Sequence, residues 1–383
     1  MRKWITPALL FAAVFLLSWL CQPYTLICQE YEGLFLNTPD AWARAWAQPL
    51  PLSGIVSDFL VQFFRDPVYG ALILATLLTL AFLLARGIFS RLGLATDSLP
   101  ALGVAVLWFF QARASEPKPV VAALLFLLAL WLLSLLLRRK NARKWKADLP
   151  LAAVVVLAAV ALIAFNPSVR RTERFSRVKR DALFGIWDDL LKTVPPSVAE
   201  EDPELTPFAL LALSGKQQLG NLMHTYPVYE ENDLDMILYD GPSEYYTSLL
   251  FKACLYQYLG CYNEAIHNYF QWSTLLSKGT SFVVLRRLVE LYYLLGDYTL
   301  MEKYCRILDH SLMNRVYVRH FRELAAQGTP READSPAVRA SIPVISHDPL
   351  YNLLLLEKNG FDTPMLRDRL PVTVFLRNLG KEE

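Results

Sequence analysis

The sequence has few of the residues and spacings that mark metal sites and enzymes. Its 383 residues include only five cysteines and five histidines, with no CxxC pair, no Cys–His spacing of the zinc-binding kind and no HxxxH or HExxH pair. It also lacks a glycine-rich phosphate loop and a GxSxG motif. We therefore expect no metal and no cofactor. Most cysteines are expected to be packing residues, although Cys21 and Cys28 could pair in an oxidising compartment.

Charge is also sparse, and it is unevenly distributed. Residues 1–166 contain 14 Lys and Arg against 8 Asp and Glu, whereas residues 167–383 contain 24 against 28. The near-neutral total gives no nucleic-acid signature. The two halves differ so much that we predict two parts, a very apolar front and a water-soluble back.

Five long uncharged runs predict membrane-spanning helices, because about 20 apolar residues cross a bilayer core of roughly 30 Å. The predicted spans are residues 4–20, 67–85, 98–112, 119–137 and 149–165. The first is read as an uncleaved span, since bulky Trp19 and Leu20 do not suit a cleavage site. The third is the weakest and is open to a tilted or re-entrant reading. Ionisable residues are absent from all five runs, which disfavours a pump or ion-coupled transporter.

The distribution of Lys and Arg over the short loops predicts the orientation. An N-terminus inside places ten basic residues in the cytoplasm and four outside, and five spans then carry residues 167–383 to the periplasmic side of a cytoplasmic membrane. Six basic residues at 170–180 oppose this prediction, because they would be translocated. Their side chains would contact either anionic lipid headgroups or solvent, and both readings stay open.

The one substantial loop, residues 22–66, is predicted to be external and contains two kinds of signal. Its apolar residues recur on one helical face at 55–64, and Trp42 and Trp46 suit the headgroup zone, which favours a helix lying in the membrane interface. The alternative is a catalytic site at Glu30, Glu32 and Asp40. Long external loops bearing carboxylates resemble those of membrane glycosyltransferases that use lipid-linked sugars, in which a carboxylate serves as base or metal ligand.

The back half contains an internal repeat with a spacing of 36 residues. An aromatic and glycine pattern at residues 255–262 recurs at 291–298, and a second helical stretch follows each copy. A glycine that ends one helix, followed by an aromatic that packs the next, predicts antiparallel helical pairs that stack. Two earlier, degenerate pairs are predicted near 170–194 and 203–225, with turns at Gly185 and Gly215.

This pattern resembles the tetratricopeptide repeat. The matching residues are Ala253, Tyr256, Gly260, Tyr262, Ala265 and Tyr269 in the first copy, and Tyr292, Gly296 and Tyr298 in the second. Trp272 and Ser277 depart from the motif, as do Met301 and Cys305. The resemblance implies recognition of a protein partner along a concave surface. We expect a helical-repeat domain at 167–327, followed by a linker and a helical tail at 328–383.

An acidic stretch at 230–240 separates the pairs. We read it as a solvated loop, because the spacing of its carboxylates lacks the glycine and terminal glutamate of an EF-hand. Within the tail, residues 350–358 are predicted to dock as a last helix.

As a whole, the chain resembles an uncharacterised bacterial family of multi-pass membrane proteins whose C-terminal domain carries degenerate helical repeats. Residues 32–40, 59–72 and 258–312 prompt this resemblance. It implies an all-α chain with a membrane bundle of about five spans and a repeat domain. The function expected is presentation of that domain for protein contacts, with the lipid bilayer and a protein as partners. The alternative is an enzyme acting on a lipid-linked substrate.

Overall fold

The computed structural model describes residues 4–94, 96–114, 117–136, 149–235, 242–328 and 348–379. All regular structure in these ranges is helical, which confirms the predicted all-α class for the described part of the chain. The chain divides into two compact units, Met1–Arg174 and Phe175–Glu383. The predicted boundary, at 166/167, lies a few residues earlier.

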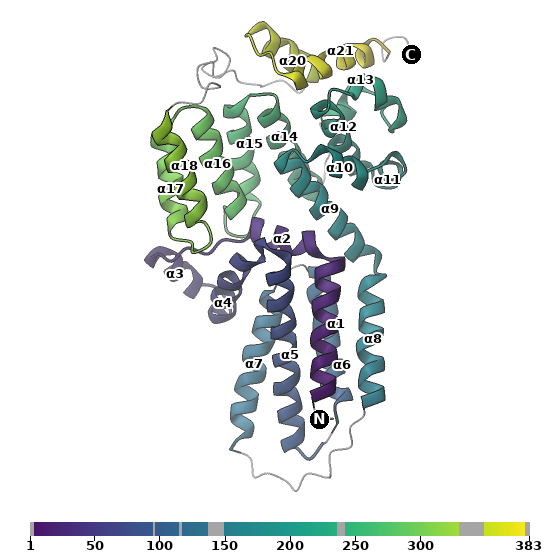
Figure 1. The fold of residues 1–383 in the computed structure, drawn as a ribbon, viewed down its shortest axis with the longest axis vertical. Coiled ribbons are helices and arrows are strands. Elements are labelled where there is room, and N and C mark those ends of the chain that lie inside the picture. The colour runs from purple at the N-terminus through teal and green to yellow at the C-terminus, as the bar shows by residue number, and fades with distance from the viewer. Residues whose placement is uncertain are drawn as a thin grey trace. The chain divides into compact units, whose positions relative to one another are not determined.

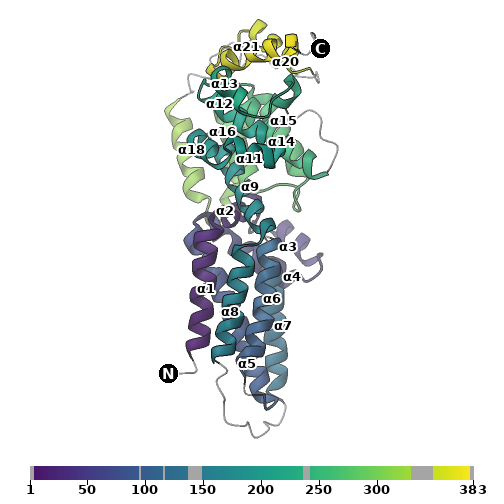
Figure 2. The ribbon, with the colours of Figure 1, turned by 90° about the vertical axis from the view of Figure 1, so that its right-hand side faces the viewer.

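In its described residues, unit 1 contains five long helices. Figures 1 and 2 show that they lie side by side and alternate in direction. They are α1 (Ile5–Cys21), α5 (Pro67–Arg91), α6 (Ser98–Ala114), α7 (Lys118–Ser134) and α8 (Leu149–Ala164). Helix α1 packs against α5 and α8, α5 also packs against α6 and α7, and α6 packs against α8. Each predicted span therefore overlaps one helix of this bundle over most of its length, and residue 137 of the fourth predicted span lies outside the described residues.

Length and composition support membrane crossing unequally among these helices. Within the described ranges, α5 is the one helix long and apolar enough to cross a membrane by itself. Two bent pairs pass the same test when each is taken as one span, namely α1 with α2 (Pro23–Glu32) and α8 with α9 (Pro167–Phe184). Helix α7 is a shorter apolar helix. The described residues thus contain one to three such spans, and the five predicted crossings remain a prediction.

The bundle is apolar on its inside and on its outside. Its core holds Leu10, Leu78, Phe82 and Trp108, all almost fully buried. Its outer surface exposes large apolar side chains along all five helices, among them Leu16, Leu72, Leu80, Leu102, Val106, Phe110, Phe126, Leu133, Val154, Leu157 and Leu162. A helix that is hydrophobic all round is typical of a deeply buried or membrane-embedded helix.

The predicted loop 22–66 is mostly helical. It contains α2 (Pro23–Glu32), α3 (Pro39–Trp46), α4 (Pro51–Val61) and a short 3-10 turn, η2 (Gln62–Arg65). A proline begins each of the three α-helices, where its missing N–H costs no hydrogen bond and its fixed φ suits the helix. The predicted helix at 55–64 therefore begins earlier, at Pro51, and ends at Val61.

Unit 2 has a helical repeat-like architecture of successive helical pairs. In chain order the α-helices are α9 (Pro167–Phe184, which begins in unit 1), α10 (Trp187–Thr193), α11 (Pro196–Glu201), α12 (Thr206–Gly215), α13 (Leu219–Leu222), α14 (Pro242–Tyr258), α15 (Tyr262–Thr274), α16 (Phe282–Leu294), α17 (Tyr298–Asp309), α18 (Arg315–Gln327), α20 (Pro349–Lys358) and α21 (Pro364–Leu379). Short 3-10 turns lie at Pro203–Leu205 (η3), Met223–Thr225 (η4) and Glu231–Leu234 (η5).

Five of these pairs close with the same backbone turn. At the end of the first helix, an N–H bonds to the carbonyl five residues earlier while the preceding residue adopts a left-handed conformation, which is a Schellman closure. The left-handed residue is Gly185, Gln217, Gly260, Gly296 and Gly360 in the five turns. The closure after α12 corrects one prediction, because the left-handed residue is Gln217 and Gly215 is the last residue of the helix.

Candidate functional site

The three carboxylates predicted for a catalytic loop lie in three different environments. Glu30 is fully buried within α2, Glu32 is half-buried at the last residue of α2, and Asp40 is exposed in the first turn of α3. In the part of the chain that the structure describes, no group of three or more His, Cys, Asp or Glu could hold a metal ion. The hypothesis that these residues are catalytic stays a prediction, because the three carboxylates lie in different environments.

A fourth carboxylate, which the sequence did not single out, caps helix α2. Glu173, near the start of α9, accepts hydrogen bonds from the backbone N–H groups of Tyr24 (2.9 Å) and Thr25 (2.8 Å) and from the Thr25 hydroxyl (2.6 Å). A carboxylate at a helix N-terminus satisfies otherwise unpaired donors and interacts favourably with the helix dipole. Glu173 therefore ties the helix that follows α1 to the helix that follows α8.

A buried carboxylate, Asp97, connects three helices at the opposite end of the bundle. Asp97, which precedes α6 and is 1% exposed, accepts a hydrogen bond from the Thr6 hydroxyl (2.9 Å) and pairs with Arg86 of α5 (3.2 Å). Arg86 is helical because α5 continues to Arg91, six residues beyond the predicted span. The ion pair joins α5 to the start of α6, the Thr6 hydrogen bond adds α1, and both charged residues lie just outside the predicted apolar cores.

The residues of the first repeat copy form the core of unit 2. Ala253, Ala265 and Tyr269 are fully buried, and Tyr256 is nearly so. The Tyr269 hydroxyl donates to the Gln257 side chain (2.9 Å), which satisfies its buried polar group. Burial raises the pKa of Tyr256 and Tyr269 well above the ordinary value, consistent with their role in packing. Gly260 closes α14, and Tyr262 begins α15 half-buried.

The second copy presents its aromatic residues differently. Tyr292 stacks on Tyr304 with ring centroids 5.6 Å apart, and both Tyr292 and Tyr298 are half-buried. The Tyr293 ring packs against the rings of Tyr298 and Phe321, with centroids 6.3 Å and 5.7 Å apart. The Phe321 ring also packs against Tyr317, with centroids 4.8 Å apart. We call these four residues, Tyr293, Tyr298, Tyr317 and Phe321, the aromatic cluster. It joins α16, α17 and α18, and each member is half-buried.

The basic residues of α9 mostly contact protein groups. Arg170 donates to the carbonyl oxygen of Ala164 (2.8 Å) and lies over the Phe165 ring, which caps the end of α8. Lys179 is buried and donates to the Tyr246 hydroxyl (2.8 Å). These contacts give residues predicted to meet lipid or solvent a structural role.

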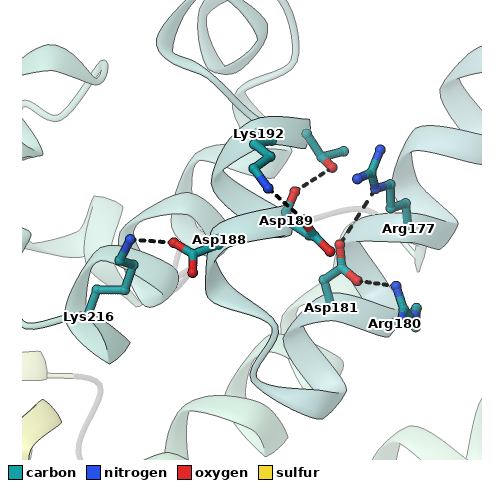
Figure 3. A network of polar contacts seen from close by, with 8 residues as sticks. Arg177, Arg180, Asp181, Asp188, Asp189, Lys192 and Lys216 are labelled. Carbon is teal, nitrogen blue, oxygen red and sulfur yellow. Dashed lines mark hydrogen bonds and ion pairs between the residues drawn. The ribbon is translucent and has the colours of Figure 1, made fainter.

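Two further arginines of α9, Arg177 and Arg180, flank the buried carboxylate of Asp181 (Figure 3). Arg180 donates to Asp181 (2.9 Å), and Arg177 lies 3.7 Å from the other carboxylate oxygen. Burial raises the pKa of Asp181 to about 6, and the two arginines only partly oppose this effect. Nearby on α10, Asp189 pairs with Lys192 (3.0 Å) and Asp188 pairs with Lys216, and these exposed pairs lower the pKa of both carboxyls.

A buried arginine holds the turn between α9 and α10. Arg287 of α16 donates to the carbonyl oxygen of Leu183, pairs with Glu290, and lies 4.4 Å from the centre of the Phe184 ring. The Tyr258 hydroxyl donates to the same carbonyl (3.1 Å). Two donors from separate repeats thus satisfy the end of α9, where helix carbonyls otherwise lack partners.

The C-terminal helix, α21, packs against the acidic stretch at 230–240. The prediction of a solvated loop is therefore wrong for residues 231–235, which contact this helix. Fully buried Arg369 of α21 donates to the Leu234 carbonyl (2.6 Å) and to the Asp235 carboxylate (2.9 Å). Arg377 donates to Glu231 (2.7 Å) and also pairs with Asp348. Between these arginines, Val372 and Leu376 join an apolar cluster with Leu210, Leu213, Leu219 and Leu234. Asp240 lies outside the described residues.

All five cysteines are free, so the suggested pairing of Cys21 and Cys28 is absent. Cys21 is exposed and the other four are buried. Burial raises the pKa of the Cys254 thiol to about 12 and that of Cys305 to about 11. These two thiols are packing groups, since the thiolate is the reactive form.

Comparisons with known proteins identify the family. Comparison with curated proteins and with solved structures finds no similar protein. Two stretches of the chain, residues 1–181 and 168–336, match a family model described as a family of unknown function (DUF6057). These matches cover most of the chain and confirm the resemblance to an uncharacterised family. The chain belongs to this family of unknown function, DUF6057.

Proposed function

We propose that the chain is an integral membrane protein that presents a helical-repeat domain for contact with another protein. The observation that carries the first part is the apolar outer surface of the bundle. Side chains such as Phe126 and Leu162, each 64% exposed, would face water in a soluble bundle at a cost of about 25 cal/mol per Å² of apolar surface. In a bilayer the same side chains face hydrocarbon, and the helices satisfy their own backbone hydrogen bonds.

The five long helices described in the bundle alternate in direction and so support five crossings, and the basic loops support an N-terminus in the cytoplasm. The repeat domain then lies on the periplasmic side of the cytoplasmic membrane. A pair of reporters fused after residue 383 tests this topology, one reporter active only in the cytoplasm and the other only outside it. Activity of the cytoplasmic reporter would overturn the five-span arrangement.

The aromatic cluster supports the second part of the proposal. Half-buried Tyr and Phe side chains combine large apolar area with little conformational entropy to lose, and interfaces are enriched in them. Tyr293, Tyr298 and Phe321 lie on three different helices of the repeat, so one partner surface would contact all three. The tetratricopeptide-like pattern at Tyr292, Gly296 and Tyr298 supports the same use of the domain.

Site-specific photocrosslinking in cells tests the partner surface. A photoreactive residue in place of Tyr293 should yield one discrete protein adduct, and the same residue in place of exposed Asn263 on α15 should not. Replacing Phe321 by alanine should reduce the adduct from position 293. Equal labelling from both positions, or none from position 293, would contradict a specific partner at the aromatic cluster.

The enzymatic alternative remains testable by one variant. If catalysis depended on Glu30, Glu32 or Asp40, replacing all three by alanine would abolish complementation of a deletion strain while the protein still accumulated in the membrane. Full complementation by the triple variant would dismiss that alternative.

A further inference from the structure

Helix α4 buries polar side chains and exposes apolar ones, which is the reverse of the pattern in a water-soluble protein. Its buried side chains are Ser53, Ser57 and Val61, spaced four residues apart on one face. Its exposed side chains include Leu52 (54%) and Val56 (37%). In water an amphipathic helix buries its apolar face and exposes its hydroxyls. The reversed arrangement indicates that the surroundings of α4 are less polar than its contact with the protein.

Helix α3 has no buried residue at all, although it contains two tryptophans. Trp42 is 37% exposed and Trp46 is 55% exposed, and they share one face because they are four residues apart. Asp40 and Arg44, also four apart, lie on the opposite face and are exposed. The Trp42 indole N–H is already bonded to the Asn37 side chain (3.0 Å), so it needs no water. Helix α3 therefore has one apolar face and one charged face, both exposed to the surroundings of the protein.

The two helices form one arm at a defined place in unit 1. Phe35 joins them, because its ring packs against Trp42 of α3 and Phe59 of α4, with ring centroids 6.3 Å and 5.5 Å apart. Helix α4 packs against α7, and a Cβ added at Gly54 would lie 3.9 Å from the Lys118 side chain at the start of that helix. Figures 1 and 2 both show α3 and α4 projecting sideways from the end of the bundle where α5 and α7 begin.

We propose that α3 and α4 lie in the interfacial layer of a phospholipid bilayer, with one exposed apolar surface at the boundary between headgroups and acyl chains. The residues of this surface are Trp42, Trp46, Leu50, Leu52 and Val56, all exposed. This inference rests on the proposed membrane location of the bundle. The arm lies level with the ends of the bundle helices, where the interface would be.

The charge pattern distinguishes this depth from full immersion. Charged side chains are strongly disfavoured at the centre of a membrane helix, so Asp40 and Arg44 would resist the hydrocarbon core. A helix with an aromatic face and a charged face satisfies both surroundings when it lies flat in the headgroup region. The lipid partner is thus recognised by the aromatic face, and Asp40 and Arg44 stay with water and headgroups.

Fluorescence quenching in nanodiscs tests the inference with a matched pair of positions. In full-length protein carrying Cys21→Ser, the remaining native thiols are buried, and a polarity-sensitive dye is attached at Trp46→Cys or Arg44→Cys. A third label at Phe126→Cys reports on the bundle. We expect lipid brominated near the glycerol to quench the dye at position 46, and aqueous iodide to quench the dye at position 44. Lipid brominated near the chain ends should quench the dye at position 126.

The other outcomes separate the two proposals. Equal iodide quenching at positions 44 and 46, with position 126 still quenched by lipid, would overturn the arm and leave the membrane bundle standing. Iodide quenching at position 126 would overturn both. Shielding of position 46 from iodide and from every brominated lipid would mean that protein covers the arm, which also overturns the inference. Leu52→Cys repeats the measurement on α4 should the variant at Trp46 fail to fold.

Discussion

Replacing Arg369 by methionine should strongly destabilise unit 2. The guanidinium is fully buried and contacts the Leu234 carbonyl, the Asp235 carboxylate and, at 3.4 Å, the Ser214 hydroxyl. Methionine fills similar volume, so the chief change is the loss of the charge and its donors. Asp235 would then keep a buried carboxylate without its cationic partner.

The size of the effect follows from that burial. Removing one member of a buried ion pair costs about 3–5 kcal/mol. In a domain of this size 1 kcal/mol moves the unfolding midpoint by about 2–4 °C, so we expect a fall of about 6–20 °C. A thiol-reactive dye measures it during a thermal ramp in a Cys21→Ser background. Buried Cys254 and Cys305 become reactive only when unit 2 unfolds.

The dependence on pH and on Asp235 provides the control. Burial raises the pKa of Asp235, and the nearby charge of Arg369 opposes that rise. Without Arg369, Asp235 should therefore bind a proton more readily, and the variant should lose less stability at low pH. Calorimetry replaces the dye at low pH, where thiols react slowly. The double variant Arg369→Met with Asp235→Leu should recover most of the loss, since an apolar pair avoids the buried charge. A fall below about 2 °C, or an equal fall in the double variant, would refute the reasoning.

Three further perturbations test other contacts. Burial raises the pKa of Asp181 from 3.8 to about 6, so its ionisation lowers the free energy of unfolding as pH rises through this window. Calorimetry between about pH 4 and pH 7 should show that Asp181→Asn removes this part of the pH dependence. A Cβ at Gly215 would lie 2.4 Å from the Trp187 ring, so Gly215→Ala should cost about 1–3 kcal/mol in a denaturant titration. Gly220→Ala, whose Cβ meets its nearest neighbour at 3.7 Å, should cost far less. Glu173→Gln should weaken the cap on α2 and lower the local free energy of unfolding by about 1–2 kcal/mol. Hydrogen exchange at the first turn of that helix should then be faster.

Local pattern predicted the long elements of this chain well. Each apolar run corresponds to one helix of the bundle, and three start at the predicted residues, Pro67, Ser98 and Leu149. The repeat spacing identified α14 to α17 because a glycine closure and a following aromatic recur in sequence. The closure at Gln217 was not predicted from the sequence, because it depends on a left-handed backbone conformation at a residue that is not glycine. The same closure at Gly360 had a signal, the Asn-Gly pair at 359–360.

The surface of the predicted loop 22–66 was harder to predict for a physical reason. Periodicity finds the apolar face of a helix but does not say whether that face meets protein or lipid. In α4 the apolar Leu52 and Val56 face outward and Ser53 and Ser57 face inward. The sequence therefore located the amphipathic helix, and only the three-dimensional packing showed which face the protein covers.

The docking of α21 was invisible for a different reason, because its partners lie 134 to 146 residues away in sequence. The acidic residues looked solvated because nothing near them in the chain was basic. One signal was present, however, since Arg369 shares a helical face with the apolar residues Val372 and Leu376. An arginine among core-facing positions requires acceptors inside the protein, because an unpaired buried charge is costly. Such an arginine in a late helix, together with an acidic stretch that lacks a local partner, is therefore reason to predict long-range docking rather than a solvated loop.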